Sequence, residues 1–446
     1  MRHIVITTLA EYQTVFWLAV AQALGRAGRA VTLLSFDDRS TEMLRTAGIA
    51  TVSFSEVEAA ATQNDIEDAL SRAGPTNPNF WFGHERVAFA RNDDQQMRRK
   101  LGGAIIAAEQ ALSAAGNEAV MLQELGGFLS VIGTFFAAQS HGIDNVFLEP
   151  SFFRGRFMLT PNSFGAPQPS PGSALSPECT RYLAETLASG EIVIPKKDSH
   201  HYNSAVSKIA NRRNLRRLGE KLTDKYLFGK QQEFGFIGTH VRQHTKMLLN
   251  SRKLRKTYTP INCLEQFIYY PFHVPGDVAL TLRAPEYLDQ LSLVDYLCRT
   301  TPDHLRVAVK EHPAMIGAID AARLADLARR YPKLAILDPG TNNYRVLRSA
   351  EGIVTVNSKS GAEAGLLGKP VIVLGDAFYR AAPFAQGLNA LSELRPALAA
   401  LNGYQPNAEA IGSWFQAVWQ DTLPGELYYS DTANIRAVAL SLQSRL

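Results

Sequence analysis

Short apolar runs alternate with amphipathic stretches along the first half of the chain. The run HIVITT at residues 3–8 predicts a buried strand, and residues 12–28 place Ala, Leu and Val on one helical face. Further strands are predicted at AVTLLSF, ATVSFS, EAVMLQ and NVFLEP, each beside a helical pattern or a loop. Because strands that alternate with helices are typical of a parallel sheet, this half is predicted to be a Rossmann-like α/β domain.

The second half of the chain restarts the same alternation. Strands are predicted at QFIYYPFHV, LRVAVKEHP, LAILDP, GIVTVNS and PVIVLG, with helices at residues 287–300 and at AARLADLARRYP. Each strand runs into a polar loop at its carboxyl end, which is where open α/β sheets bind ligands. We therefore expect two Rossmann-like domains facing a cleft, at residues 1–255 and 256–446, with the last helix a candidate to cross back.

Two segments interrupt this pattern. Residues Leu159 to Pro195 are rich in Pro, Ser and Gly, which predicts an irregular surface loop, either a lid or an inert excursion. Lys and Arg crowd between Lys208 and Lys256, where apolar residues at helical spacing predict a basic amphipathic helix or helix pair. With few aromatic residues nearby, we favour a peripheral contact with the inner membrane over nucleic acid; a solvated charged face is the alternative.

Composition narrows the class of protein. The chain has 446 residues, 46% hydrophobic and 20% charged, which suits a globular protein with two large domains. Three separated cysteines without a CxxC predict neither disulfides nor a zinc site, and the N-terminus lacks a signal-peptide pattern, so we expect a cytoplasmic protein. No GxGxxG follows the first strand and no DxD occurs, so we expect no dinucleotide cofactor and no metal.

The loop with the clearest chemical pattern is TVNSKSGAEAGLLGKPVIVLGDAFY, at residues 355–379. A buried strand ends in a turn containing Ser358, Ser360 and Gly361, and a helix begins with Glu363 in its first turn. Free N–H groups at a helix N-terminus suit a phosphate, the serines add hydroxyl donors, and Glu363 would accept both hydroxyls of a ribose. The alternative is an N-capped helix between core strands, with Glu363 only favourable to the helix dipole.

Two other loops of the second half present histidines. In VAVKEHPAM, Pro313 holds His312 extended at the strand end, close to Lys310, where it can donate to an anion or move a proton. In YYPFHVPGD the strand opens into His273 and Asp277. Asp277 is either ordinary turn chemistry or a carboxylate facing a sugar, as nucleophile or as stabiliser of an oxocarbenium ion.

A carboxylate also ends the last strand predicted in the first half. Glu149 in NVFLEPSFFRGRF is followed closely by Arg154 and Arg156. Across the cleft from Asp277, it would complete a pair of carboxylates, one of them a general acid/base. The alternative is a surface ion pair between Glu149 and Arg154.

The segments FLEP…RG, PFHVPGD, KEHP and NSKSGAEAGLLGKPVIVLG, with FY just beyond, resemble in this order the capsule polysaccharide biosynthesis family, in particular its retaining β-Kdo transferases. The resemblance covers the second half well and the first half only around Glu149. Relatives often show a QPE-type sequence where this chain has VPGD. The resemblance implies a GT-B glycosyltransferase with an N-terminal acceptor domain and a C-terminal domain that binds CMP-Kdo.

The resemblance also implies roles for single residues. Asp277 would attack the anomeric carbon and displace CMP, Glu149 would serve as base for the acceptor hydroxyl, and His312 would donate to the departing phosphate or the sugar carboxylate. The donor would be held by His273, Arg154, Lys310, Ser358, Ser360, Gly361 and Glu363. The donor would be CMP-Kdo or a CMP-linked pseudaminic or sialic-type acid, and the acceptor a bacterial surface glycan or glycolipid.

Two other functions fit the same pattern. A UDP-sugar 2-epimerase shares the two-domain fold and a similar helix that carries a glutamate, but it would need a UDP site. A non-catalytic glycan-binding or assembly protein would keep the fold and tolerate loss of Asp277 and Glu149.

Overall fold

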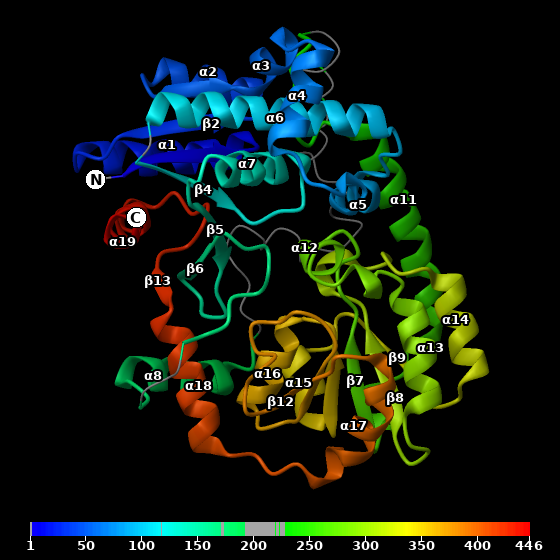
Figure 1. The fold of residues 1–446 in the computed structure, drawn as a ribbon. Helices are drawn as coiled ribbons and strands as arrows, with labels where there is room; N and C mark the ends of the chain where they lie inside the picture. The colour runs from blue at the N-terminus through cyan, green and yellow to red at the C-terminus, as the bar shows by residue number, and fades with distance from the viewer. Residues whose placement is uncertain (1, 117, 171–173, 192–218, 220–222, 224–227) are drawn as a thin grey trace.

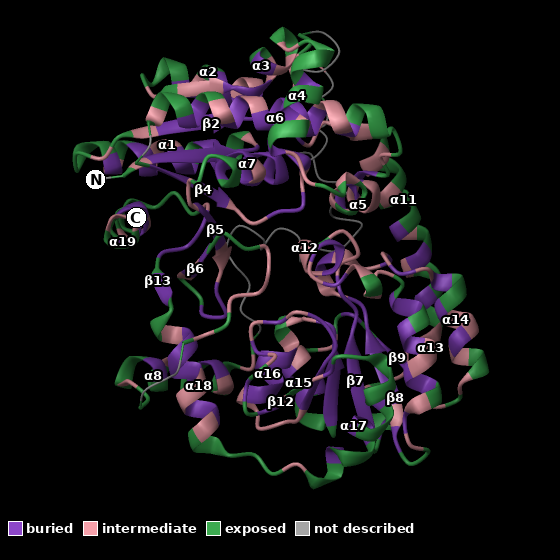
Figure 2. Cartoon of the chain, in the orientation of Figure 1, coloured by how far each residue is buried: buried purple, intermediate pink, exposed green. Residues whose placement is uncertain are grey.

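Two separate β-sheets organise the part of the chain that the computed structural model describes, residues 2–116, 118–170, 174–191, 219, 223 and 228–446. The first sheet and its helices lie in the upper half of Figure 1, and the second sheet lies in the lower half. In Figure 2 the strands are mainly buried, whereas exposed residues lie on the outer faces of the surrounding helices. Strands covered on both faces need apolar residues at every position, which explains the unbroken apolar runs of the sequence.

The first sheet has the strand order β13-β6-β5-β4-β1-β2-β3. Its central strands are parallel, whereas β6 is antiparallel to β5 and β13 is antiparallel to β6. The strands are β1 (His3–Thr8), β2 (Val31–Ser35), β3 (Ala50–Ser53), β4 (Ala119–Glu124), β5 (Asn145–Pro150), β6 (Arg156–Pro161) and β13 (Thr422–Pro424).

Helices cover both faces of this first sheet. Along β1, Val5 packs on the side of α6 and α7, whereas Ile4 and Ile6 pack on the side of α1 and α19. Successive side chains of a strand point to opposite faces of the sheet. Since helices cover both faces, all three side chains are fully buried. The helices of this part are α1 (Glu11–Arg26), α2 (Asp38–Thr46), α3 (Phe54–Ala60), α4 (Gln63–Ala73), α5 (Pro78–Phe89), α6 (Asp94–Ala115) and α7 (Leu129–Ser140). Helix α8 (Pro177–Ser189) lies instead beside the second domain, where Cys179 and Leu183 pack in one apolar cluster with Val346 (Figure 1).

The second sheet is parallel throughout and has the order β12-β11-β10-β7-β8-β9. Its strands are β7 (Phe267–Pro271), β8 (Arg306–Lys310), β9 (Leu334–Leu337), β10 (Gly352–Thr355), β11 (Val371–Val373) and β12 (Ala385–Gly387). Its helices are α12 (Val278–Thr281), α13 (Gln290–Thr300), α14 (Ala321–Arg330), α15 (Asn343–Ser349), α16 (Lys359–Leu366) and α17 (Leu394–Ala400).

The C-terminal stretch returns to the first domain. After α18 (Ala408–Gln420), Leu423 of β13 pairs with Phe157 of β6, and α19 (Thr432–Arg445) packs against α1. The blue and red ends of the chain accordingly lie together in Figure 1. Two Rossmann-like α/β domains with a returning C-terminal helix form the GT-B arrangement, so the predicted fold class is confirmed.

Part of the loop predicted between Leu159 and Pro195 is regular structure. Helix α8 lies inside this region, and that part of the prediction was wrong. The side chain of Ser176 accepts a hydrogen bond from the N–H of Cys179, a proline occupies the first turn, and Gly190 ends the helix with φ of 60°. The Pro, Ser and Gly residues of this region therefore include the signals that start and stop a helix.

The basic segment predicted at Lys208–Lys256 is described only in part. The residues of it that lie outside the described part of the chain are 208–218, 220–222 and 224–227. The remainder contains α11 (Ile237–Leu254), which joins the two domains: Gln243 donates to the carbonyl of Ala88, and Asn250 donates to the carbonyl of Gly317. Over the residues that the structure describes, every helix is too short or too polar to cross a membrane.

Gly133 allows α7 to approach α6 closely. A Cβ at this position would lie 2.7 Å from the Cβ of Ala104 and 2.9 Å from the carbonyl oxygen of Leu101. We expect Gly133→Val to lower the free energy of unfolding by about 2–3 kcal/mol, because the two helices must move apart. Gly25→Ala in α1 is the matched control: its Cβ meets nothing within 4 Å, so it should stabilise by about 0.5–1 kcal/mol. Thermal unfolding of both variants measures this difference, and equal midpoints would contradict it.

Candidate active site

Three polar loops of the second domain meet at one edge of its sheet. Strands β10, β7 and β8 are neighbours and parallel, so the loops at their carboxyl ends lie together. The loop after β7 carries His273 and Asp277, the loop after β8 carries His312, and the loop after β10 carries Ser358. The charges of Asp277 and His312 both act on the ring of His273. The structure therefore brings these predicted residues together.

His273 is buried and held in one orientation. Gln290 accepts from its backbone N–H at 2.7 Å and donates to its carbonyl at 3.0 Å. The ring atom Nε2 accepts from the backbone N–H of Asn357 at 3.1 Å, which assigns the ring proton to Nδ1. Nδ1 is buried, and the side chain of Gln290 interacts with the ring. Burial lowers the pKa of His273 to about 4, against the attraction of Asp277, so the ring stays neutral.

Asp277 is exposed and caps the short helix α12. One carboxylate oxygen accepts from the N–H of Ala279 at 2.8 Å. Burial lowers the pKa of both His84 and His273, and the charge of Asp277 opposes that shift in each. The carboxylate therefore lies close to two histidines, one from each domain.

His84, on α5 of the first domain, was not predicted as a site residue. Its Nδ1 lies 2.7 Å from the hydroxyl of Thr281, and that hydroxyl donates to the carbonyl of Asp277 at 3.0 Å. Because a hydroxyl has one proton, His84 is the donor to Thr281, and its buried Nε2 carries the lone pair. The ring lies against Gly127, where a Cβ would be only 2.3 Å away. In sequence, a lone histidine among NFWFGHERVAF looks like an ordinary core residue.

Glu149 lies at the domain interface, as an ion pair with Arg283. The guanidinium donates to both carboxylate oxygens, at 3.0 and 2.7 Å, and also to the carbonyls of Phe164 and Gly165. The Glu149 and Arg283 side chains are 16% and 10% exposed, which makes this a mostly buried bidentate pair across the two domains. Glu149 was predicted as a site residue from its place at a strand end, whereas Arg283 was not, because no local pattern in LTLRAPEY indicates a partner so distant in sequence.

Glu363 and Lys310 form the buried polar end of the site. Glu363 accepts from the side-chain amide of Asn343 at 2.7 Å, and Lys310 donates to the carbonyl of Thr341 at 2.9 Å. Burial raises the pKa of Glu363 to about 7 and lowers the pKa of Lys310 to about 8, and in each case the charge of the other residue opposes the shift. Near neutral pH, Glu363 can therefore both accept and donate a hydrogen bond, which suits sugar hydroxyls.

The loop before α16 forms the predicted N-cap. The hydroxyl of Ser358 accepts from the N–H of Ser360 at 3.3 Å. Gly361 has a packing role, because a Cβ there would lie 2.5 Å from the ring of Tyr379, whose hydroxyl donates to the carbonyl of Ser358. That Ser358, Ser360 and Gly361 bind a phosphate stays a prediction.

Arg154 lies in the exposed turn between β5 and β6. Its backbone N–H donates to the hydroxyl of Tyr182 on α8 at 2.6 Å. The alternative ion pair between Arg154 and Glu149 is replaced by the pair with Arg283. Among the described residues, no group of three or more His, Cys, Asp or Glu side chains gathers as metal ligands.

Comparison with known proteins identifies the family. Residues 134–397 match the family described as capsule polysaccharide biosynthesis protein. This chain belongs to that family. The match spans β5, the interdomain segments and most of the second domain, and it confirms the family that the motifs predicted.

Individual relatives of this capsule polysaccharide biosynthesis protein are distant. Protein FixF of Sinorhizobium fredii (strain NBRC 101917 / NGR234) is 29% identical over 174 residues, which are 38% of this chain and 41% of FixF. The chain thus spans about two fifths of the length of the curated relative it matches.

Solved structures with a similar arrangement are more distant still. KpsC of Thermosulfurimonas dismutans, described as a beta Kdo 2,7 transferase, is 10% identical with a TM-score of 0.39, over 99% of each chain. Anabaena HepE in complex with UDP-glucose is 12% identical with a TM-score of 0.32, over the whole of both chains. At TM-scores this low, neither structure informs the chemistry of this chain.

The ion pair between Glu149 and Arg283 should couple the two domains energetically. In a double-mutant cycle of Glu149→Gln and Arg283→Met, we expect a coupling of about 1–3 kcal/mol, because the pair is bidentate and mostly out of water. The exposed bidentate pair of Arg45 and Glu56 is the matched control, with an expected coupling of about 0.2–1 kcal/mol. Thermal unfolding of the single and double variants measures both values. Equal coupling energies in the two cycles would contradict a larger contribution of the interdomain pair to stability.

The buried histidines should make stability depend on pH. The folded-state pKa of His273, about 4, lies below the ordinary value of 6.5, so the unfolded chain binds a proton that the folded chain cannot. The resulting loss of stability begins as pH falls below about 6.5 and is complete near 4. Relative to the wild type, His273→Gln should therefore gain up to about 3 kcal/mol between pH 7 and 4. The difference in thermal midpoint across that range measures it.

Glu363→Gln provides the control of opposite sign. The folded-state pKa of Glu363, about 7, is raised above 4.5, so its favourable protonation is present at low pH and is lost as pH rises through 7. Relative to the wild type, this variant should gain stability as pH rises from about 4.5 to 7. Parallel pH profiles for Glu363→Gln and His273→Gln would contradict both assignments.

Proposed function

We propose that this protein transfers a 2-keto-3-deoxy acid sugar, most simply Kdo, from its CMP donor to a bacterial surface-glycan acceptor with retention of configuration. The observation that carries the proposal is the setting of Asp277. Its carboxylate is exposed, lies at the carboxyl edge of the second sheet, and is close to neutral histidines from both domains. A fixed, accessible carboxylate among uncharged neighbours is suited to nucleophilic attack.

The proposed reaction is a double displacement. An oxygen of Asp277 forms a bond to the anomeric carbon, and the bond from that carbon to the CMP phosphate breaks, so that CMP leaves with the electron pair. The acceptor hydroxyl then attacks the same carbon, its proton goes to a base, and the bond to Asp277 breaks. In this proposal His312 would donate to the carboxylate of the sugar or to the departing phosphate, with the neutral ring of His273 packed beside it.

Glu149 is the proposed base, and Arg283 controls its availability. In the ion pair both oxygens of Glu149 are occupied. A donor brings a phosphate and a carboxylate, and either would compete for the guanidinium of Arg283. We infer that donor binding draws Arg283 away and frees Glu149 for the acceptor proton. The ribose of CMP would contact Glu363, with Lys310 beside it, and neither a metal nor another cofactor is part of this proposal.

The acceptor side of the proposal includes the inner membrane. From residue 234 to residue 264 the chain contains no acidic residue, and α11 exposes Arg242, Lys246, Arg252 and Lys253 to solvent. Basic side chains on one exposed helix favour anionic lipid head groups by about 1 kcal/mol each. We propose a cytoplasmic protein that touches the inner leaflet through this helix and acts there on a glycan or glycolipid.

Asp277→Asn tests the nucleophile directly. Asparagine can keep the cap of α12, so the fold should survive, while transfer from CMP-Kdo to an oligosaccharide acceptor should fall by at least about 1,000-fold. Mass spectrometry of the product and of a sugar adduct on Asp277 provides the readout. Asp320→Asn is the matched control, because Asp320 caps α14 in the same way on an outer helix. Full transfer by Asp277→Asn would remove Asp277 from the mechanism.

Protection against thermal unfolding tests the nucleotide. CMP should raise the unfolding midpoint, and Glu363→Ala should reduce that shift. Protection by UDP but not by CMP would support a UDP-sugar 2-epimerase instead.

A further inference from the structure

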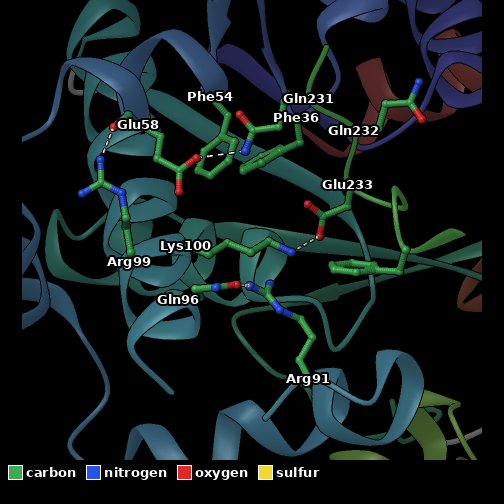
Figure 3. Close-up of a pocket in the computed structure, with 11 residues that line it drawn as sticks. Phe36, Phe54, Glu58, Arg91, Gln96, Arg99, Lys100, Gln231, Gln232 and Glu233 are labelled. Atoms are coloured by element: carbon green, nitrogen blue, oxygen red, sulfur yellow. Dashed lines mark hydrogen bonds and ion pairs between the residues drawn. The ribbon is translucent and has the colours of Figure 1, made fainter. Parts of the chain in front are cut away.

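A pocket of about 220 Å³ opens in the first domain, at the carboxyl ends of β2 and β3. Figure 3 shows its lining. One wall is formed by the buried rings of Phe36 and Phe54, whose centroids are 4.9 Å apart, and Lys100 of α6 lies opposite them. This is the edge at which open α/β sheets bind ligands, and the pocket is much larger than one water molecule needs.

The pocket is closed on one side by residues 231–236, which are firmly fixed. The backbone N–H of Gln231 donates to Asp38 at 2.7 Å, and the N–H of Asp38 donates back to the carbonyl of Gln231 at 3.1 Å. Glu233 is buried and accepts from Lys100 at 2.7 Å and from Ser130 at 2.9 Å. The pocket is therefore preformed, which reduces the entropy that a ligand must overcome on binding.

The charges around the pocket balance one another. Lys100 pairs with both Glu85 and Glu233, at 2.6 and 2.7 Å, and Arg91 pairs with the second oxygen of Glu85 at 2.8 Å. Arg99 donates to the main-chain carbonyl of Glu58, whose carboxylate also lines the pocket. Three cationic side chains thus accompany three carboxylates, which argues against a phosphate or another strongly charged ligand.

The remaining lining offers both kinds of hydrogen-bonding group beside aromatic surface. Gln96 and Arg99 provide donors, Glu58 provides an acceptor, and Gln231 holds that carboxylate from the other side at 2.9 Å. A sugar ring needs this combination, because its hydroxyls both donate and accept while its C–H faces pack on aromatic rings. We propose that this pocket binds one uncharged monosaccharide unit of the acceptor glycan.

The proposal rests on the proposed function, and the pocket is connected to the reaction site. Glu85, which holds Lys100 and Arg91, follows His84 directly on α5, and it also accepts from the N–H of Leu129 at 3.0 Å. His84 is the residue that contacts Thr281 beside Asp277. One helix therefore joins the sugar pocket to the reacting carboxylate, and a glycan with its terminal hydroxyl at Asp277 would extend toward the pocket.

Saturation-transfer NMR with methyl glycosides tests the pocket without any donor. The probes are the methyl glycosides of glucose, galactose, N-acetylglucosamine and Kdo, with methyl phosphate, which carries observable C–H protons, as the phosphate probe. At least one uncharged glycoside should bind the full chain, with a dissociation constant of about 1 mM. Gln96→Trp, which fills the mouth, should weaken that binding at least about tenfold. Gln95→Trp is the matched control, because Gln95 is exposed on the same helix and does not line the pocket.

Three results would overturn the proposal: equal binding by Gln96→Trp and the wild type, binding of phosphate or the Kdo glycoside in preference to the uncharged sugars, or no binding of any glycoside. Gln96→Ala, which removes the amide without adding bulk, replaces Gln96→Trp if that variant does not fold. If the protein binds a sugar in this pocket but CMP does not raise its unfolding midpoint, the pocket is a sugar site and the proposed transfer reaction fails. If Gln96→Trp transfers sugar as fast as the wild type, the transfer reaction occurs but does not use this pocket.

Discussion

The geometry of the site depends on contacts that residues of the first domain make with residues 277–283. Helix α12 has four residues, too few to be stable by its own hydrogen bonds. In the donor-free protein it is fixed from the other domain by the contact of His84 with Thr281 and by the pair of Glu149 with Arg283. Asp277 begins this segment, so the position of its carboxylate is set jointly by both halves of the chain.

The protonation of the groups around that segment is decided by burial, because the nearby charges and hydrogen bonds offset only part of the cost of removing each charged form from water. His84 and His273 are kept neutral because their rings are out of water. For the same reason Glu363 keeps its proton up to a higher pH than an exposed glutamate does. These shifts have opposite effects on the dependence of stability on pH, so they partly cancel in the wild-type protein. The proton that Glu363 takes up in mild acid therefore offsets part of the stability that the two histidines lose there.

Much of the fold follows from the sequence, because strands buried on both faces are unbroken apolar runs. HIVITT became β1 and VAVKEHP became β8 with its loop, and parallel pairing then placed His273 and His312 at one edge. Helix α8 was missed because its capping residues have the composition of a loop. His84 and Arg283 were missed for another reason: each acquires its role through a contact between residues more than 100 positions apart, which no local pattern records.

The pairing of β13 with β6 has a consequence for biosynthesis. Strand β6 leaves the ribosome early, whereas its antiparallel partner follows roughly 260 residues later, a delay of about 13 to 50 s at ~5–20 residues per second. During this interval the first sheet has an open edge, and α1 lacks the cover of α19. The nascent protein therefore passes through a stage with an unpaired strand and an uncovered apolar surface, when a ribosome-bound chaperone would have most to protect.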